Sequence, residues 1–139
     1  MTEEDAIMST STKQTTMAVR TFRDLRVWQA AYDMTVALYR QCEQFPKHEL
    51  YALTNQMTRA AVSVCSNIAE GFGRRSLREK DQFYAMANGS LTELENQLLI
   101  CRGVGYITSA QFLDLQRRCY ATHKMLVALQ NVNRSKSDH

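Results

Sequence analysis

The chain has 139 residues, which is enough for one domain with a hydrophobic core, and 45% of them are apolar and 22% charged. Only 5 glycines and 1 proline argue against a β-sandwich or barrel with many turns and favour a few long helices. A net charge of +3 permits nucleic-acid contact without indicating it alone. No apolar run approaches the roughly 18 residues of a membrane span, and no signal pattern is present. We therefore expect a cytoplasmic protein without membrane association.

Residues 1–21 are polar and lack periodicity, so we predict a flexible arm there, followed by a first helix from about Phe22 to Glu43. The core-facing row is predicted from residues that recur every three or four positions: Leu25, Trp28, Tyr32, Thr35, Tyr39 and Cys42. Phe45 and Pro46 end this helix, because the residue before a proline is disfavoured in the α conformation.

A second helix is predicted from about Lys47 to Ala69 or Glu70. Its apolar row consists of Leu50, Leu53, Met57, Ala61, Val64 and Ile68. We expect Gly71 and Gly73 to end the helix, because glycine enters the left-handed C-terminal conformation without steric cost.

The third and fourth helices each begin at a predicted capping box, which pairs Ser76 with Glu79 and Thr108 with Gln111. The third helix is expected to end near Gly103. Its row is Leu77, Lys80, Tyr84, Ala87, Leu91, Leu94, Leu98 and Cys101. The row of the fourth helix is Phe112, Leu115, Cys119, Thr122, Leu126 and Leu129. Residues 131–139 read as a flexible tail. The pattern predicts an all-α, antiparallel up-down-up-down four-helix bundle over residues 22–130.

A second row on the second helix is polar. Its members recur at steps of three and four and are Gln56, Arg59, Ser63, Asn67 and Glu70. Amide and hydroxyl groups hydrogen-bond at close range, and a buried one without a partner costs about 1–3 kcal/mol. The row therefore predicts polar contacts inside the bundle or across a subunit interface. A ligand site is the competing interpretation.

Gly89 and Glu93 extend this polar surface onto the third helix. A glycine inside a helix costs roughly 0.5–1 kcal/mol relative to alanine, so we expect another helix to approach closely there. That helix belongs either to the same bundle or to a neighbouring subunit, and Ala85 lengthens the strip of small residues. A catalytic site would instead need Arg59, Glu70 and Glu93 together in one pocket.

Basic residues gather around the predicted turn between the second and third helices, where the helix N-terminus also has free amides. We predict a contact surface for RNA or DNA phosphates at this turn and on the fourth helix. Its residues are Arg74, Arg75, Arg78, Lys80, Arg117 and Arg118. The competing interpretation is a solvated loop.

The cysteines are widely spaced, and we expect reduced thiols in or near the core; they are Cys42, Cys65, Cys101 and Cys119. Cys119 and His123 lie one helical turn apart, but two ligands alone do not close a zinc site. The Glu-x-x-His motifs of di-iron bundles do not occur in the sequence. We expect no metal, no other cofactor and no catalytic residue.

Four segments of the chain resemble a known protein family. They are FRDLRVWQ at 22–29, FPKHELYALTNQ at 45–56, RAAVSVCSNIAEGFGR at 59–74 and GSLTELENQL at 89–98. The family is that of the four-helix-bundle proteins encoded in intervening sequences of bacterial 23S ribosomal RNA genes. The resemblance covers roughly residues 22–130 and implies a ring-like homo-oligomer, a pentamer, with no established reaction. The fold is similar to that of the accessory variability proteins of diversity-generating retroelements, which bind nucleic acid and a reverse transcriptase through basic surfaces.

The residues and the resemblance together lead us to expect a non-enzymatic oligomeric bundle. We expect it to contact structured RNA, or a nucleic-acid-processing partner, through its basic surface. The alternative is a protein-interaction scaffold with no nucleic-acid role, in which the faces that carry Asn67, Glu70 and Glu93 serve self-assembly.

Overall fold

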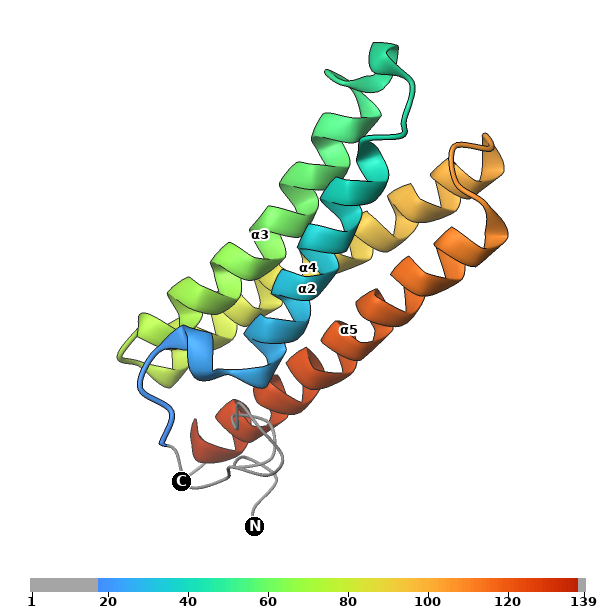
Figure 1. The fold of residues 1–139 in the computed structure, drawn as a ribbon. Coiled ribbons are helices and arrows are strands. Elements are labelled where there is room, and N and C mark those ends of the chain that lie inside the picture. The colour runs from blue at the N-terminus through green and yellow to red at the C-terminus, as the bar shows by residue number, and fades with distance from the viewer. Residues whose placement is uncertain (1–17, 138–139) are drawn as a thin grey trace.

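The computed structural model describes residues 18–137, and these residues form helices and no β-strand. The long helices are α2 (Arg26–Cys42), α3 (Leu53–Gly73), α4 (Leu77–Gly103) and α5 (Ser109–Ser137), and the short 3-10 turns are η1 (Phe22–Asp24) and η2 (Lys47–Glu49). Helices α2 and α4 each pack against both α3 and α5. Figure 1 shows the α2–α3 and α4–α5 connections at one end of the molecule and the α3–α4 turn at the other. This is the connectivity of the predicted bundle. In the described part of the chain, no helix is long and apolar enough to cross a membrane.

One row from each long helix forms the core. On α5 the whole predicted row is buried, and on α3 and α4 the predicted rows are buried apart from their first two residues. Leu50 is 52% exposed, because it precedes α3 and lies in the connection from α2. Burial of these rows supplies most of the stability of the bundle, since apolar area removed from water contributes roughly 25 cal/mol per Å².

The buried row of α2 agrees with the prediction at its two ends, Leu25 and Cys42, and differs from it by one position in between. The prediction followed the aromatic side chains, but Tyr32 and Tyr39 are 51% and 49% exposed. The fully buried residues are Val27, Ala31, Met34 and Leu38. Both rows have helical spacing, and the slimmer aliphatic row fits the centre of the bundle. The aromatic row consequently borders solvent, where Trp28 stacks on Tyr32 with ring centroids 5.3 Å apart.

The first two long helices begin later than predicted, because a short 3-10 turn precedes each of them. In η1, Thr21 and Asp24 form a capping box in which Asp24 Oδ2 accepts the Thr21 amide at 3.0 Å. The chain then extends at Leu25 before α2 begins. In η2, Glu49 Oε2 accepts the amide of Leu53 at 3.1 Å and thereby caps the start of α3.

The predicted capping box is complete at α5, whereas at α4 only the serine half of it forms among the described residues. Ser76 Oγ accepts the Glu79 amide at 3.0 Å. Thr108 Oγ1 accepts the Gln111 amide at 3.1 Å, and Gln111 Oε1 accepts the Thr108 amide at 2.8 Å. These bonds satisfy amides that have no partner inside the helix.

Gly71 and Gly73 do not end α3 in the predicted left-handed conformation. Both lie inside the helix, and among the described residues the one glycine with positive φ is Gly105, at +82°. Gly71 has a different role, because α4 packs directly against it. A Cβ atom added at Gly71 would lie 2.7 Å from Cε1 of Tyr84. The requirement for glycine is therefore steric, at the contact between α3 and α4.

Helix α5 continues to Ser137, through most of the segment predicted as a C-terminal tail. Asn133 is buried and donates from Nδ2 to the Leu77 carbonyl oxygen at 2.8 Å. Arg134 pairs with Asp81 at 3.0 Å. These contacts attach the last turns of α5 to α4 and overturn the tail prediction for residues 131–137. Of the arm predicted at 1–21, residues 1–17 lie outside the described residues, as do residues 138–139. Residues 18–21 are described and contradict the arm prediction, because Val19 packs against the core and the amides of Arg20 and Thr21 donate to Asp24 Oδ2.

Candidate nucleic-acid interface and polar groove

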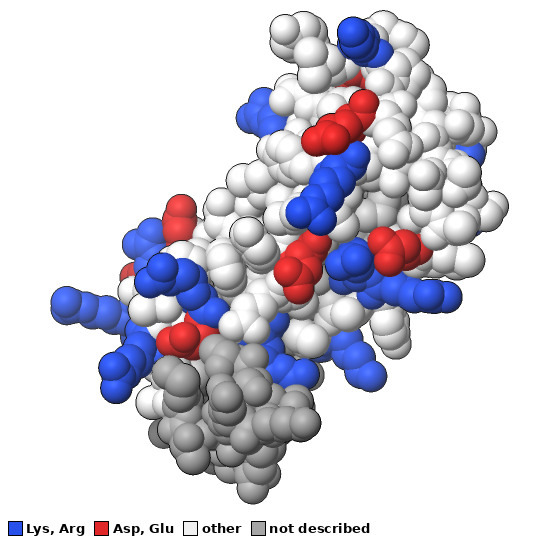
Figure 2. All heavy atoms as spheres, in the orientation of Figure 1, with Lys and Arg blue, Asp and Glu red and all other residues white. Residues whose placement is uncertain are grey.

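The end of the bundle that carries the α3–α4 turn brings together cations from distant parts of the chain. The contacts of Asn133 and Arg134 place the end of α5 beside the start of α4, and η1 packs against α3. We call this surface the basic end. Its basic residues are Arg20, Arg23, Arg26, Arg74, Arg75, Arg78, Lys80, Arg134 and Lys136. Figure 2 shows lysine and arginine side chains gathered over this half of the molecule.

The arginines of the α3–α4 turn differ in how strongly the protein engages them. Arg74 forms an exposed pair with Glu70 at 3.7 Å, and its guanidinium lies 4.6 Å from the ring centroid of Phe83. Arg75 and Arg78 are exposed and form no ion pair with any described residue. Arg75 and Arg78 are therefore the side chains of this turn that are accessible to an external anion.

Lys80 is already engaged inside the protein. Its Nζ donates to the carbonyl oxygen of Phe72 at 2.7 Å and lies 3.4 Å from that of Gly71. Burial, together with the nearby charge of Lys136, lowers the pKa of Lys80 below its ordinary value. A cation at the C-terminus of a helix satisfies carbonyls that lack internal partners and interacts favourably with the helix dipole. Lys80 thus stabilises the end of α3.

Arg117 and Arg118 lie away from the basic end. They precede Arg134 by at least sixteen residues on α5, which is roughly 24 Å along the axis at 1.5 Å per residue. Arg118 is also paired with Asp114 at 3.1 Å. The structure therefore separates the predicted basic residues into two groups. Only the group at the α3–α4 turn lies near the cations of η1 and of the last turns of α5.

The predicted polar row of α3 faces α4, and part of it is used inside the bundle. The hydroxyl oxygens of Ser63 and Ser90 are 2.8 Å apart. Asn67 Nδ2 donates to the Ser63 carbonyl oxygen at 2.9 Å and to Ser63 Oγ at 3.0 Å. The contact between Ser63 and Ser90 joins α3 to α4, and Asn67 binds Ser63 from within α3.

The first part of the row borders an open groove of about 350 Å³ between α3 and α4. Gln56, Arg59 and Glu93 are exposed and line it. Glu70 is not part of the groove, because it lies eleven residues beyond Arg59, roughly 16 Å along α3. The three groups that a catalytic pocket would require, Arg59, Glu70 and Glu93, therefore do not meet within one chain.

Gly89 lies in the middle of α4 beside this groove and is exposed. A Cβ atom added there would have no heavy atom within 4 Å, so the expected close approach of another helix is not made inside the chain. One turn past Glu93, Gln97 is buried and donates from Nε2 to Glu93 Oε1 at 3.2 Å. The Gln97 Oε1 atom is buried and has no hydrogen-bond partner among the described residues.

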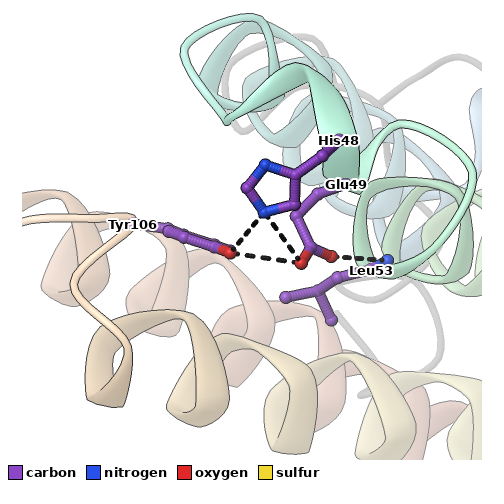
Figure 3. Close-up of polar contacts among 4 residues, drawn as sticks. All are labelled: His48, Glu49, Leu53 and Tyr106. Atoms are coloured by element: carbon purple, nitrogen blue, oxygen red, sulfur yellow. Dashed lines mark hydrogen bonds and ion pairs between the residues drawn. The ribbon is translucent and has the colours of Figure 1, made fainter.

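A cluster at the opposite end of the bundle was not predicted from the sequence (Figure 3). Tyr106 donates its hydroxyl to Glu49 Oε1 at 3.1 Å, and the other carboxylate oxygen accepts the Leu53 amide. His48 Nε2 lies 3.6 Å from Glu49 Oε1 and 3.5 Å from the Tyr106 hydroxyl. Desolvation, and next the bond to Glu49, raise the pKa of Tyr106. The cluster joins the α2–α3 and α4–α5 connections, which are more than fifty residues apart and share no local sequence signal.

The thiols are in environments that suppress reactivity. All four cysteines are free, and burial raises the pKa of Cys119 to about 12. His123 Nδ1 lies 2.9 Å from Asn88 Oδ1, so its ring is engaged with α4. Among the described residues, no group of three or more His, Cys, Asp or Glu side chains is placed to hold a metal ion.

The described residues thus define a four-helix bundle that has a basic end and a polar groove. The family described as 23S rRNA-intervening sequence protein matches residues 23–128, and the chain belongs to this family. A crystal structure of a protein of unknown function from the S23 ribosomal protein family of Bacteroides thetaiotaomicron has a TM-score of 0.70 to this chain. The two are 18% identical, and the match covers 76% of this chain and 95% of the other, which shows a shared fold. The comparison with curated proteins found no match.

Proposed function

We propose that this protein is a non-enzymatic, homo-oligomeric cytoplasmic bundle that binds RNA, alone or with a nucleic-acid-processing partner, through phosphate contacts at its basic end. One observation carries the proposal: cations from η1, the α3–α4 turn and the end of α5 converge on a single surface. Arg75 and Arg78 are exposed there without an ion pair to any described residue. A guanidinium group offers paired N–H donors that match phosphate oxygens. The affinity of such contacts is salt-dependent and largely independent of sequence.

Two features of the groove between α3 and α4 support self-association. Gly89 leaves an open strip on α4, which a helix of another copy fits. Arg59 and Glu93 are exposed on opposite helices of the groove, and neither forms an ion pair with a described residue. A second copy would provide partners for both charges. A ring such as the pentamer that the family resemblance implies would repeat the basic end, and multivalency would then strengthen RNA binding.

The test of RNA binding compares two double variants of equal charge. Arg75→Glu with Arg78→Glu alters the basic end, and Arg40→Glu with Arg117→Glu alters exposed arginines elsewhere. Both reduce the net charge from +3 to −1, because each replacement removes two charge units. Fluorescence anisotropy with a labelled RNA should show a loss of about tenfold or more for the first variant only, since reversal replaces attraction by repulsion. Equal losses in both variants, or none in either, would refute the basic end as the site.

The alternative, a scaffold with no nucleic-acid role, is favoured by the half-exposed aromatic row of α2. Thr35 Oγ1 lies 3.3 Å from Cys65 Sγ, which places this row beside α3 and its exposed Val62. Exposed apolar groups of this kind mark protein interaction surfaces. The scaffold predicts tight oligomers in light scattering and a purified protein whose ultraviolet absorbance ratio shows no nucleic acid. If RNA co-purifies with the protein and charge reversal at the basic end removes that RNA, the result favours the first proposal.

A further inference from the structure

A notch of about 160 Å³ opens on the basic end, between the α3–α4 turn and the last turns of α5. Its walls are mostly apolar and include Phe72, Leu77 and Val132, and its polar residues are Lys80, Asn133 and Lys136. The notch is far smaller than the roughly 300–1,000 Å³ of pockets that enclose a drug-sized ligand. It therefore suits one small, flat group of a larger molecule.

The lining indicates a group that is apolar on its faces and attached to an anion. A bare phosphate gains little from apolar walls, because it binds through charge and hydrogen bonds. A nucleobase has an apolar π face and a polar edge, and its phosphate is one sugar away. Arg78 follows Leu77 directly in the chain and Arg75 precedes it by two positions, so cations lie next to the notch.

Asn133 gives the notch a means of reading the edge of a base. It is 5% exposed, lines the notch and donates from Nδ2 to the Leu77 carbonyl oxygen at 2.8 Å. Its Oδ1 atom forms no hydrogen bond with a described residue and can accept from an exocyclic amino group. A bond to the protein backbone thus fixes the orientation of the amide.

We propose that the notch receives one unstacked base of a single-stranded RNA segment, while Arg75 and Arg78 bind the phosphates beside that base. The inference rests on the proposed function and assigns the class of RNA that the basic end prefers. Single-stranded segments expose bases that proteins hold by stacking and by hydrogen bonds to the base edges, whereas the bases of a duplex are inaccessible.

The first test measures the affinity of the full chain for a labelled 12-nucleotide single strand and for the blunt duplex of the same sequence. The duplex has the higher charge density, so phosphate contact alone favours the duplex. Base capture reverses this order, and we expect the single strand to bind about tenfold more tightly. If the duplex binds equally or more tightly, base capture in the notch is refuted, whereas phosphate binding at the basic end is not.

The second test fills the notch by replacing Val132 with phenylalanine. Val132→Phe should weaken single-strand binding about five- to tenfold and leave duplex binding unchanged. Val104→Phe is the matched control, because Val104 is 57% exposed and lies at the other end of α4. Unchanged single-strand binding by a folded Val132→Phe variant would contradict the inference.

A third measurement uses the unaltered protein, in case Val132→Phe does not fold. A single strand that carries 4-thiouridine is cross-linked by light, and the attached peptides are identified by mass spectrometry. We expect cross-links on peptides that contain Phe72, Tyr84 or Val132, which line the notch. Cross-links confined to peptides that contain no lining residue would refute base capture in the notch. If Arg75→Glu with Arg78→Glu weakens neither RNA, the proposed function fails as well.

Discussion

Replacement of Gly71 by alanine tests the contact between α3 and α4. The new methyl group would lie 2.7 Å from Tyr84 Cε1 and 3.0 Å from Phe83 Cβ, whereas carbon atoms prefer about 3.5–4.0 Å. Tyr84 is 2% exposed, and Phe83 Cβ is attached directly to the α4 backbone, so relief of these contacts requires α4 to shift. Overpacking typically costs about 1–3 kcal/mol, and alanine returns roughly 0.5–1 kcal/mol of helix propensity. We expect the free energy of unfolding to fall by about 1–2 kcal/mol.

The assay is urea unfolding followed by circular dichroism, at one protein concentration because association also stabilises the fold. Gly73→Ala is the control, since Gly73 belongs to the same helix and has no heavy atom within 4 Å of an added Cβ atom. Its stability should stay equal or rise slightly. The steric explanation is wrong if Gly71→Ala proves as stable as Gly73→Ala.

Three further predictions follow from individual contacts. Lys80→Met removes the ammonium donor to the Phe72 carbonyl and should lower the free energy of unfolding by about 1 kcal/mol; an unchanged urea midpoint would contradict this role. Deletion of residues 131–139 removes the bonds of Asn133 and Arg134 to α4 and should lower the thermal midpoint by several degrees, whereas a flexible tail would leave it unchanged. At pH 8, Cys101 and Cys119 should react with Ellman's reagent far more slowly in the native protein than in urea, because burial raises each pKa to about 12 and leaves little thiolate; rapid native reaction would refute their burial.

Periodicity predicted most of the buried row on three of the long helices, α3, α4 and α5. It failed between the two ends of the α2 row, because the aromatic row and the aliphatic row are adjacent and equally periodic. Which row is buried depends on the space between the other helices, and a single sequence does not contain that information. The large side chains Tyr32 and Tyr39 consequently lie at the edge.

The glycines also show that the packing between helices cannot be predicted from one sequence. Gly71 and Gly73 read as a helix stop, but glycine is also used where a neighbouring helix packs too closely for a Cβ atom. The identity of that neighbour, Tyr84, depends on how α4 crosses α3. Caps could be predicted because their partners are three residues apart, as Thr108 and Gln111 are.

The part of the candidate site that comes from one continuous stretch of the sequence was predictable. Arg74, Arg75 and Arg78 are adjacent in the sequence and remain together at the α3–α4 turn. The contribution of α5 was not predictable, because its last turns were assigned to a tail. Arg117 and Arg118 were grouped with the turn by charge alone, although the rise of a helix places them far along its axis.

The salt dependence of RNA binding tests the central claim most directly. For a single-stranded RNA, the slope of log affinity against log salt concentration is roughly −0.7 for each phosphate contacted. We predict a clearly negative slope for the unaltered protein, reduced in magnitude by about 1.4 in Arg75→Glu with Arg78→Glu and unchanged in Arg40→Glu with Arg117→Glu. A flat slope for the unaltered protein, or the same slope in both double variants, would contradict phosphate binding at the basic end.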